Sequence, residues 1–255
     1  MRHLEFQNDG QFRLTDDLLD NELPAYAILS HTWGQDCEEV KFEDLMKNSG
    51  PDKAGRDKIK FCAKQAAKDD LRFFWVDTCC IKTSSDRELS QAINSMFRWY
   101  RGAARCYVYL SDVSTRKRKE RNQISHNTWE PAFRESRWFT RGWTLQELLA
   151  PPSVEFFSKE HERLGDRQSL RQEIHEITGI PISALEGRPL PHFSIEERMS
   201  WAVKRNTKHE EDKTYSLLGI FGVYMSLIYG EGMHSARRRL LKEIREASPS
   251  KSSLS

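Results

Sequence analysis

Three polar clusters in this sequence follow or interrupt apolar runs and contain side chains able to do chemistry. Residues 25–34, AYAILSHTWG, end an apolar run on a hydroxyl, an imidazole and an indole. Residues 73–81, FFWVDTCCI, end a second run on a carboxylate, and residues 139–151, FTRGWTLQELLAP, hold a guanidinium, an indole and a second carboxylate. The candidate site residues are Ser30, His31, Thr32, Trp33, Asp77, Thr78, Arg141, Trp143 and Glu147.

The elements that must position these side chains are buried strands. Four short runs without polar alternation predict strands whose two faces are both covered: residues 26–30, 72–77, 106–110 and 154–157. In an open parallel sheet, ligands bind beyond the carboxyl ends of the strands. The first two polar clusters stand at such ends, so we expect them to meet at one edge of the sheet.

Helical patterns lie between and after these strands. Two stripes show the spacing of an amphipathic helix: Ile59, Cys62, Ala63, Ala66 and Ala67, then Leu89, Ala92, Ile93, Met96, Phe97 and Tyr100. Further helices are expected at 167–178, 195–205, 212–218 and 233–247. Strands alternating with helices predict an α/β fold with a mainly parallel sheet flanked by helices, and additional helices in the C-terminal half.

Each candidate also has a purely structural interpretation. Thr144 and Glu147 fit a T-x-x-E capping box, and on local spacing alone that interpretation is favoured over a catalytic carboxylate. His31 can bond a backbone carbonyl at a strand end, and Asp77 can cap the turn that follows it. Trp33 can belong to the core. The local pattern does not separate these alternatives.

Charge and hydropathy exclude several classes of protein. Forty basic and 38 acidic residues give a formal charge of +2, whereas an electrostatic nucleic-acid binder has a clearer basic excess. Residues 116–121, RKRKER, are expected to form a solvated loop. No run approaches 18 apolar residues, so no membrane span is expected. Residues 1–10 lack the apolar centre of a signal peptide, which favours a cytoplasmic protein.

The five cysteines and the glycines indicate no metal or phosphate-loop chemistry. The cysteines stand at 37, 62, 79, 80 and 106, an odd number without a CxxC pair, so we expect buried, reduced thiols and no metal site. No GxxxxGK[ST] motif occurs. The last eight residues, SPSKSSLS at 248–255, are expected to form a flexible tail or linker.

Four ordered motifs resemble the signature blocks of the fungal heterokaryon incompatibility (HET) domain. They are YAILSHTWG at 26–34, FFWVDTCCI at 73–81, RGWTLQELLAP at 141–151 and EEDKTYSLLGIFGVYMSLIYGEG at 210–232. The resemblance covers residues 1–247 and is greatest to the domain that precedes the nucleotide-binding and repeat modules of fungal NOD-like receptors. It departs from the family pattern at Lys82 and Ser226.

The resemblance implies a cell-death effector in nonself recognition, and it extends distantly to TIR domains. TIR domains have a flavodoxin-like sheet, here expected at about 20–160, and many of them cleave NAD between nicotinamide and ribose. The segment GWTLQEL then resembles their W-x-x-x-E motif, which makes Glu147 the catalytic carboxylate. Residues 26–33 and Asp77 would face the substrate, NAD, with no separate cofactor. The comparison also implies self-association into a dimer or higher oligomer, and further receptor modules as partners.

Three hypotheses about function follow. In the first, the nicotinamide of NAD is already a cationic leaving group that needs no general acid, and Glu147 stabilises the oxocarbenium-like ribose while Trp143 helps to shape and dry the pocket. In the second, the domain signals by self-association alone and its polar motifs are structural. In the third, Cys79 acts as a nucleophile with His31 and Asp77, although a cysteine so close to the acid in sequence makes such a relay awkward.

Overall fold

The structure is a computed structural model of the 255-residue chain. It describes residues 1–7, 12–47, 49–50, 52–116 and 129–247. Nearly all of the charge run at 116–121 and the whole of the C-terminal segment at 248–255 lie outside the described residues. The predictions of a solvated loop and of a flexible tail therefore stay predictions.

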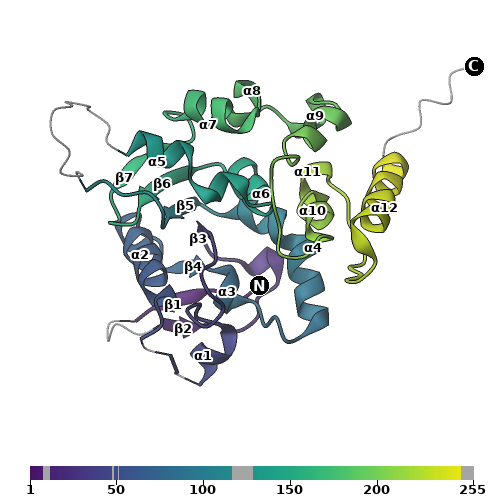
Figure 1. Cartoon of the computed structure of the whole chain (residues 1–255). Coiled ribbons are helices and arrows are strands. Elements are labelled where there is room, and N and C mark those ends of the chain that lie inside the picture. The colour runs from purple at the N-terminus through teal and green to yellow at the C-terminus, as the bar shows by residue number, and fades with distance from the viewer. Residues whose placement is uncertain (8–11, 48, 51, 117–128, 248–255) are drawn as a thin grey trace, which may run out of the picture.

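A single sheet of seven described strands forms the centre of the molecule (Figure 1), in the order β2-β1-β4-β3-β5-β6-β7. The strands are β1 (Leu4–Phe6), β2 (Phe12–Leu14), β3 (Tyr26–His31), β4 (Phe73–Trp75), β5 (Arg105–Leu110), β6 (Val154–Ser158) and β7 (Arg163–Asp166). All four predicted strands are present, as β3, β4, β5 and β6. They pair in parallel, in the order β4-β3-β5-β6.

The sheet as a whole is mixed, which corrects the expectation of a mainly parallel sheet. β1 and β2 form an antiparallel pair that adds to β4, and β7 adds antiparallel to β6. These three strands have only three or four residues each, and β7 contains Gly165. Such short segments carry too little periodic signal to be found in a sequence. The fold is therefore mixed α/β, with a parallel centre and antiparallel edges.

Helices cover both faces of the sheet (Figure 1). α2 (Gly55–Lys68) packs on β3, β4 and β5, while α4 (Asp86–Gly102) and α6 (Thr144–Leu149) lie on the opposite face. The stripe predicted in α4 faces the sheet, and Ser85 caps this helix by accepting from the Glu88 N–H at 3.4 Å. In α2 the predicted stripe is buried except for Ala67, which is exposed.

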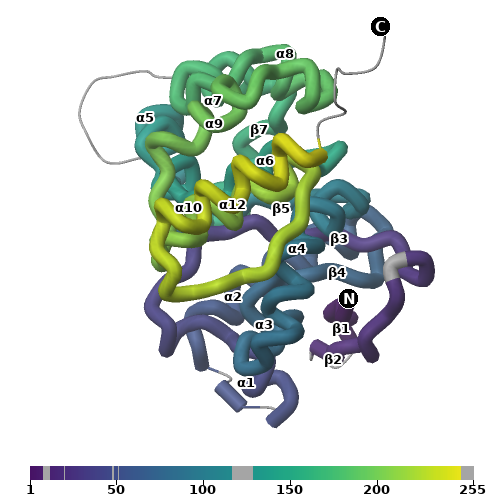
Figure 2. Tube along the Cα trace, turned by 90° about the vertical axis from the view of Figure 1, so that its right-hand side faces the viewer, coloured from purple at the N-terminus to yellow at the C-terminus, as the bar shows by residue number. Residues whose placement is uncertain are grey.

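The C-terminal half is helical, as predicted; the helices predicted at 167–178, 195–205 and 212–218 are shorter in the structure, whereas the one predicted at 233–247 has nearly its full extent. Its α-helices besides α6 are α5 (Glu130–Arg134), α7 (Arg171–Thr178), α8 (Ile182–Leu185), α9 (Ile195–Ser200), α10 (Asp212–Tyr215), α11 (Leu218–Phe221) and α12 (Gly232–Ala247). Figure 2 shows α12 lying alongside α10, against which it packs. Among the described residues no helix is both long and apolar enough to span a membrane.

The strand register brings two of the predicted clusters to the same edge. β3 and β4 are adjacent and parallel with Ile28 opposite Trp75, so the residues that follow reach the same edge, where His31 contacts Asp77. β4 ends at Trp75, and Asp77 begins a one-turn helix, α3 (Asp77–Cys80), instead of ending the predicted strand at 72–77. A short α1 (Phe42–Met46) contacts α3 from the loop after β3.

Candidate functional site

The polar cluster at the end of β3 is divided between the two faces of the sheet. Successive side chains of a strand point to opposite faces. Ser30 therefore points toward α6 and contacts Glu147, whereas His31 points toward α2 and contacts Lys58. Both side chains are buried. The hydroxyl and the imidazole thus do not face one pocket, contrary to what their adjacency in the sequence suggests.

On the α6 face, Glu147 is held by a chain of hydrogen bonds. The indole N–H of Trp138 donates to Ser30 Oγ at 2.8 Å, and the Ser30 hydroxyl donates to Glu147 Oε2 at 2.5 Å. Trp138 belongs to a short 3-10 helix, η2 (Arg137–Thr140), directly before α6. The carboxyl group of Glu147 is 5% exposed and lies at the carboxyl end of the central strand β3.

The capping box favoured by the local spacing is wrong. Trp143 occupies the N-cap position of α6, and no side-chain capping hydrogen bond forms there. The Thr144 hydroxyl instead donates to the carbonyls of Trp138 at 2.6 Å and Arg141 at 2.9 Å. The Thr144 hydroxyl therefore does not cap the helix, and the Glu147 carboxyl is directed to Ser30.

Burial gives Glu147 unusual acid–base properties. Desolvation raises the pKa of Glu147 from 4.5 to about 8, and the negative charge of Asp77 adds to this increase. Hydrogen bonds from Ser30 and Tyr100 and the positive charge of Arg205 oppose the pKa increase. A buried carboxyl with a pKa this close to neutrality is typical of functional sites, although structural networks can produce one as well.

On the α2 face, His31 lies in a second buried network. Its Nε2 contacts Asp77 Oδ1 at 2.9 Å, and its Nδ1 contacts Lys58 Nζ at 2.9 Å. An ammonium group is only a donor, so Nδ1 must accept and Nε2 must carry the proton given to Asp77. Lys58, 8% exposed, also donates to Glu39 Oε1 at 2.6 Å. The network Glu39–Lys58–His31–Asp77 thus fixes the tautomer of His31.

Asp77 joins this network to an exposed indole. Trp33 is 40% exposed, and its indole N–H donates to Asp77 Oδ2 at 2.8 Å, while the backbone N–H of Thr78 donates to Oδ1 at 2.7 Å. Burial opposes ionisation, but attraction to His31 and the bonds from His31 and Trp33 outweigh it and lower the pKa of Asp77. Thr32 contributes its carbonyl, which accepts from Lys58 at 3.5 Å.

The other two candidates from the third motif have partners away from Glu147. The indole of Trp143 is hydrogen-bonded to Asp212 in α10. The carbonyl of Arg141 accepts from Arg205 Nη1 at 2.9 Å, and Arg141 forms an isolated bridge with Asn206. In the described residues the Arg141 guanidinium forms no ion pair. The i, i+4 spacing of Trp143 and Glu147 therefore does not direct them to a shared partner.

The arrangement of the cysteines does not favour a thiol nucleophile. Four of the five are buried as expected, while Cys37 is exposed. Burial raises the pKa of the Cys79 thiol well above its usual range, and the thiol faces the carbonyl of Val76 at 3.8 Å. Both ring nitrogens of His31 are engaged elsewhere. Within the described part of the chain, no group of three His, Cys, Asp or Glu side chains is placed to hold a metal ion.

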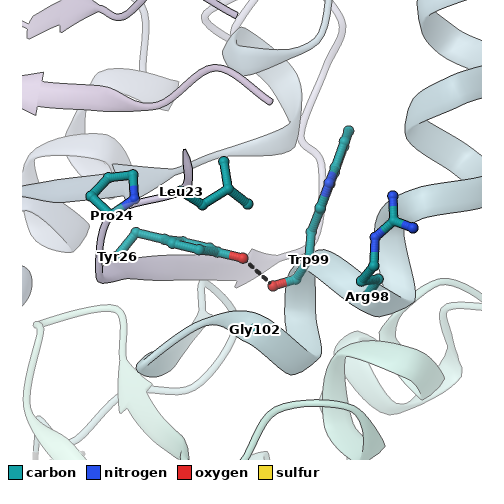
Figure 3. A pocket seen from close by; sticks show the side chains of 6 residues that line it. All are labelled: Leu23, Pro24, Tyr26, Arg98, Trp99 and Gly102. Atoms are coloured by element: carbon teal, nitrogen blue, oxygen red, sulfur yellow. Dashed lines mark hydrogen bonds between the residues drawn. The ribbon is translucent and has the colours of Figure 1, made fainter. Parts of the chain in front are cut away.

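Two cavities of the structure lie at the other edge of the sheet, where the parallel strands begin. The first, about 240 Å³, is lined by Leu23, Pro24, Tyr26, Arg98, Trp99 and Gly102. Figure 3 shows the Tyr26 hydroxyl directed at the Trp99 carbonyl across this cavity, at 2.6 Å. The second, about 210 Å³, adjoins the first residues of β5 and β6, Arg105 and Val154. Neither cavity is lined by Glu147 or Asp77.

Several residues of these networks were not found in the sequence: Glu39, Lys58, Tyr100, Trp138 and Arg205. One signal was available for Lys58, which stands four residues before Cys62 and hence on the predicted buried face of its helix. A buried lysine needs partners, and this position predicts a polar network. The roles of the other four residues depend on contacts between distant segments.

Fold and site together define a mixed α/β domain with a buried acid at the tip of a central parallel strand. Comparisons with known proteins give its family. Residues 26–130 match the model of the family described as heterokaryon incompatibility protein (HET). The chain is 57% identical over 244 residues to Vegetative incompatibility protein HET-E-1 of Podospora anserina. Both matches confirm the resemblance of this chain to the HET domain that its motifs indicate.

The matches have definite extents. The similarity to HET-E-1 covers 96% of this chain but 18% of the relative, so the chain spans about a fifth of the length of the curated relative it matches. The family model ends at residue 130, before Trp138, Glu147 and Arg205. No solved structure matches the chain significantly.

Proposed function

We propose that this chain is a cell-death effector domain of fungal nonself recognition, and that it cleaves NAD at the bond between nicotinamide and ribose. The name of the relative, a vegetative incompatibility protein, supports the biological role. The catalytic part rests on one observation, the buried Glu147 carboxyl at the end of β3. The domain comprises residues 1–247, and the parallel order β4-β3-β5-β6 is the order typical of flavodoxin-like and TIR-like cores at about 20–160.

The chemistry of the cleavage suits a single buried carboxyl. The nicotinamide of NAD is cationic while it is bonded, so it leaves as a neutral molecule with the bonding electron pair and needs no general acid. Water then adds to the ribose carbon and loses a proton to the solvent. Positive charge develops on the ribose, and an anionic oxygen in a low-dielectric site stabilises it more than water would. Because burial raises the pKa of Glu147 to about 8, an approaching cation favours loss of its proton. Binding of the substrate would then increase the ionised fraction of Glu147.

The remaining candidates would bind the other parts of NAD. Trp33 offers an exposed ring at the same edge, held in place by Asp77. Ser30, His31, Thr32, Thr78, Arg141 and Trp143 are proposed to position ribose and phosphate groups. Glu147 is 5% exposed, so NAD must be admitted by a rearrangement. We propose that self-association into a dimer or larger oligomer, driven by other receptor modules, causes this opening.

The burial of Glu147 also favours a second function. A carboxyl bonded to Ser30, with the two described cavities at the far edge of the sheet, equally suits a domain that signals only by self-association. In that case the two polar networks maintain the fold, and cell death follows from assembly without consumption of NAD.

One pair of variants separates these functions. Glu147→Gln keeps the size of the side chain and an oxygen that accepts from Ser30, but it cannot become anionic. Glu130→Gln, in a surface pair with Arg134, is the matched control. Each chain is fused to an inducible oligomerising tag and incubated with NAD, and released nicotinamide is measured by chromatography.

We expect at least a hundredfold loss of NAD cleavage in Glu147→Gln and none in Glu130→Gln. Retention of cleavage by folded Glu147→Gln would overturn the catalytic role. If the oligomerised wild-type chain kills cells while their NAD content stays constant, the interaction function is correct instead.

A further inference from the structure

Arg205 is a buried arginine in the loop between α9 and α10. Its side chain is 2% exposed, and it forms no ion pair within 4.0 Å in the part of the chain that the structure describes. Burial lowers the pKa of its guanidinium to about 10, which leaves it charged at neutral pH. An isolated buried charge is costly unless it has strong partners, so its position calls for a specific role.

The partners of this guanidinium lie at the start of α6. Nη1 donates to Thr144 Oγ1 at 2.8 Å and to the carbonyl of Arg141 at 2.9 Å, and Nε donates to the Trp201 carbonyl at 3.3 Å. Thr144 is the first residue of α6, and Glu147 is three residues later on the same short helix. Arg205 thus fixes the helix turn from which the Glu147 side chain projects.

The backbone next to Arg205 reinforces this contact. The Gly142 N–H donates to the Asn206 carbonyl at 2.9 Å, and the Asn206 N–H donates to the Thr140 carbonyl at 2.6 Å. The approach is close, because a Cβ on Gly142 would lie 2.4 Å from Thr207 Cγ2. The segment around Arg205 is therefore docked directly on the segment that enters α6.

The charge of Arg205 acts on the Glu147 carboxyl itself. Attraction between the two groups lowers the pKa of Glu147 and raises that of Arg205, in each case against the larger effect of burial. One guanidinium nitrogen, Nη2, is buried and has no hydrogen-bond partner among the described residues. A neutral donor could make the two hydrogen bonds to Thr144 and Arg141 at the start of α6. A positive charge near Glu147 has the additional effect of stabilising its anion in a site without water.

We propose that Arg205 is the positioning residue of Glu147: it fixes the start of α6 and supplies the positive charge that lets the buried carboxyl become an anion. The inference rests on the proposed role of Glu147. It also assigns a function to the C-terminal helical half, which provides this charge from outside the sheet.

The test measures ionisation of Glu147 directly, by NMR titration of carboxyl carbons in chains with labelled glutamate. Arg205→Met removes the charge, and Arg205→Lys keeps it without the forked donors. Arg198→Met is the matched control, because Arg198 is a part-buried arginine of α9 that donates to the Ile220 carbonyl at 3.1 Å and lies over Phe221. The groups that face Glu147 are Ser30, Tyr100, Cys106, Asp77 and Arg205.

We expect Arg205→Met to raise the pKa of Glu147 by about one unit. Arg205→Lys should raise this pKa by less than half as much, and Arg198→Met should leave it unchanged. An unchanged titration in folded Arg205→Met would overturn the inference. If this variant does not fold, Arg205→Gln replaces it, since glutamine also removes the charge but keeps an amide N–H that can donate to Thr144. An unchanged titration there has the same meaning.

Failure of this inference can be distinguished from failure of the proposed function. If the Arg205 variants shift the titration but no assembly of the wild-type chain cleaves NAD, the positioning role holds and the catalytic role of Glu147 does not. If cleavage of NAD depends on Glu147 but the pKa of Glu147 is unchanged in the Arg205 variants, the proposed function holds and the positioning role is wrong.

Discussion

The protonation of Glu147 makes a quantitative prediction about stability. Its pKa is about 8 in the folded protein, against 4.5 for an ordinary glutamate, because burial favours the neutral acid. Between these pH values the folded chain holds a proton that the unfolded chain releases. The stabilisation is therefore complete below pH 4.5 and is lost as pH rises toward 8, at about 1.4 kcal/mol per pH unit. The whole effect is on the order of 5 kcal/mol.

Glu147→Gln isolates this effect, because glutamine is neutral at every pH and can still accept from Ser30. The free energy of unfolding of the variant, minus that of the wild type, should increase by about 2.7 kcal/mol from pH 5.5 to 7.5. Groups other than Glu147 titrate in both chains and cancel in the difference. Urea unfolding followed by tryptophan fluorescence at four pH values within this range measures it.

The control and the refuting result are both definite. For the surface variant Glu130→Gln, the difference in unfolding free energy from the wild type should vary by less than about 0.5 kcal/mol over the same pH range. If the difference in unfolding free energy between Glu147→Gln and the wild type varies equally little with pH, Glu147 is already ionised in the folded chain. The argument that burial keeps it neutral would then be wrong, whatever the outcome of the NAD assay.

Two further predictions concern the packing around the site. Lys58→Met should destabilise the fold by about 3–5 kcal/mol, because it leaves the buried carboxylate of Glu39 without its cation. Adding Glu39→Gln should restore part of this loss, as measured by urea unfolding. A double variant no more stable than Lys58→Met would contradict the pairing. Gly219→Ala should cost about 1–3 kcal/mol, because the new Cβ would lie 2.0 Å from Phe97 Cβ where α11 meets α4. An unchanged thermal midpoint would show that these helices are not so closely packed.

Much of the central fold could be predicted from the sequence. Contiguous apolar runs define β3, β4, β5 and β6, and amphipathic stripes define α2 and α4, because a strand buried on both faces and a helix buried on one leave distinct periodicities. The antiparallel strands β1, β2 and β7 leave no such periodicity over three or four residues. For that reason the sequence predicted a mainly parallel sheet, and the structure has a mixed one.

The sequence alone also determined which polar residues stand at the strand ends. Ser30 lies near the end of β3 and Asp77 follows β4, and the parallel pairing of these strands brings both residues to one edge. The sequence alone could not determine what each of these side chains contacts at the edge of the sheet. Thr144 and Glu147 have the spacing of a capping box, and that spacing is identical whether the carboxyl turns to its own helix or elsewhere.

Tertiary structure decided the direction of Glu147, because its partner Ser30 is 117 residues away in the chain. It likewise brought Lys58 to His31 and Arg205 to the start of α6, over separations of 27 and 61 residues. Local spacing specifies which groups share a face of one element. Only the packing of distant elements specifies how deeply a charge is buried and which partner it meets, and these two quantities set the acid–base behaviour of the site.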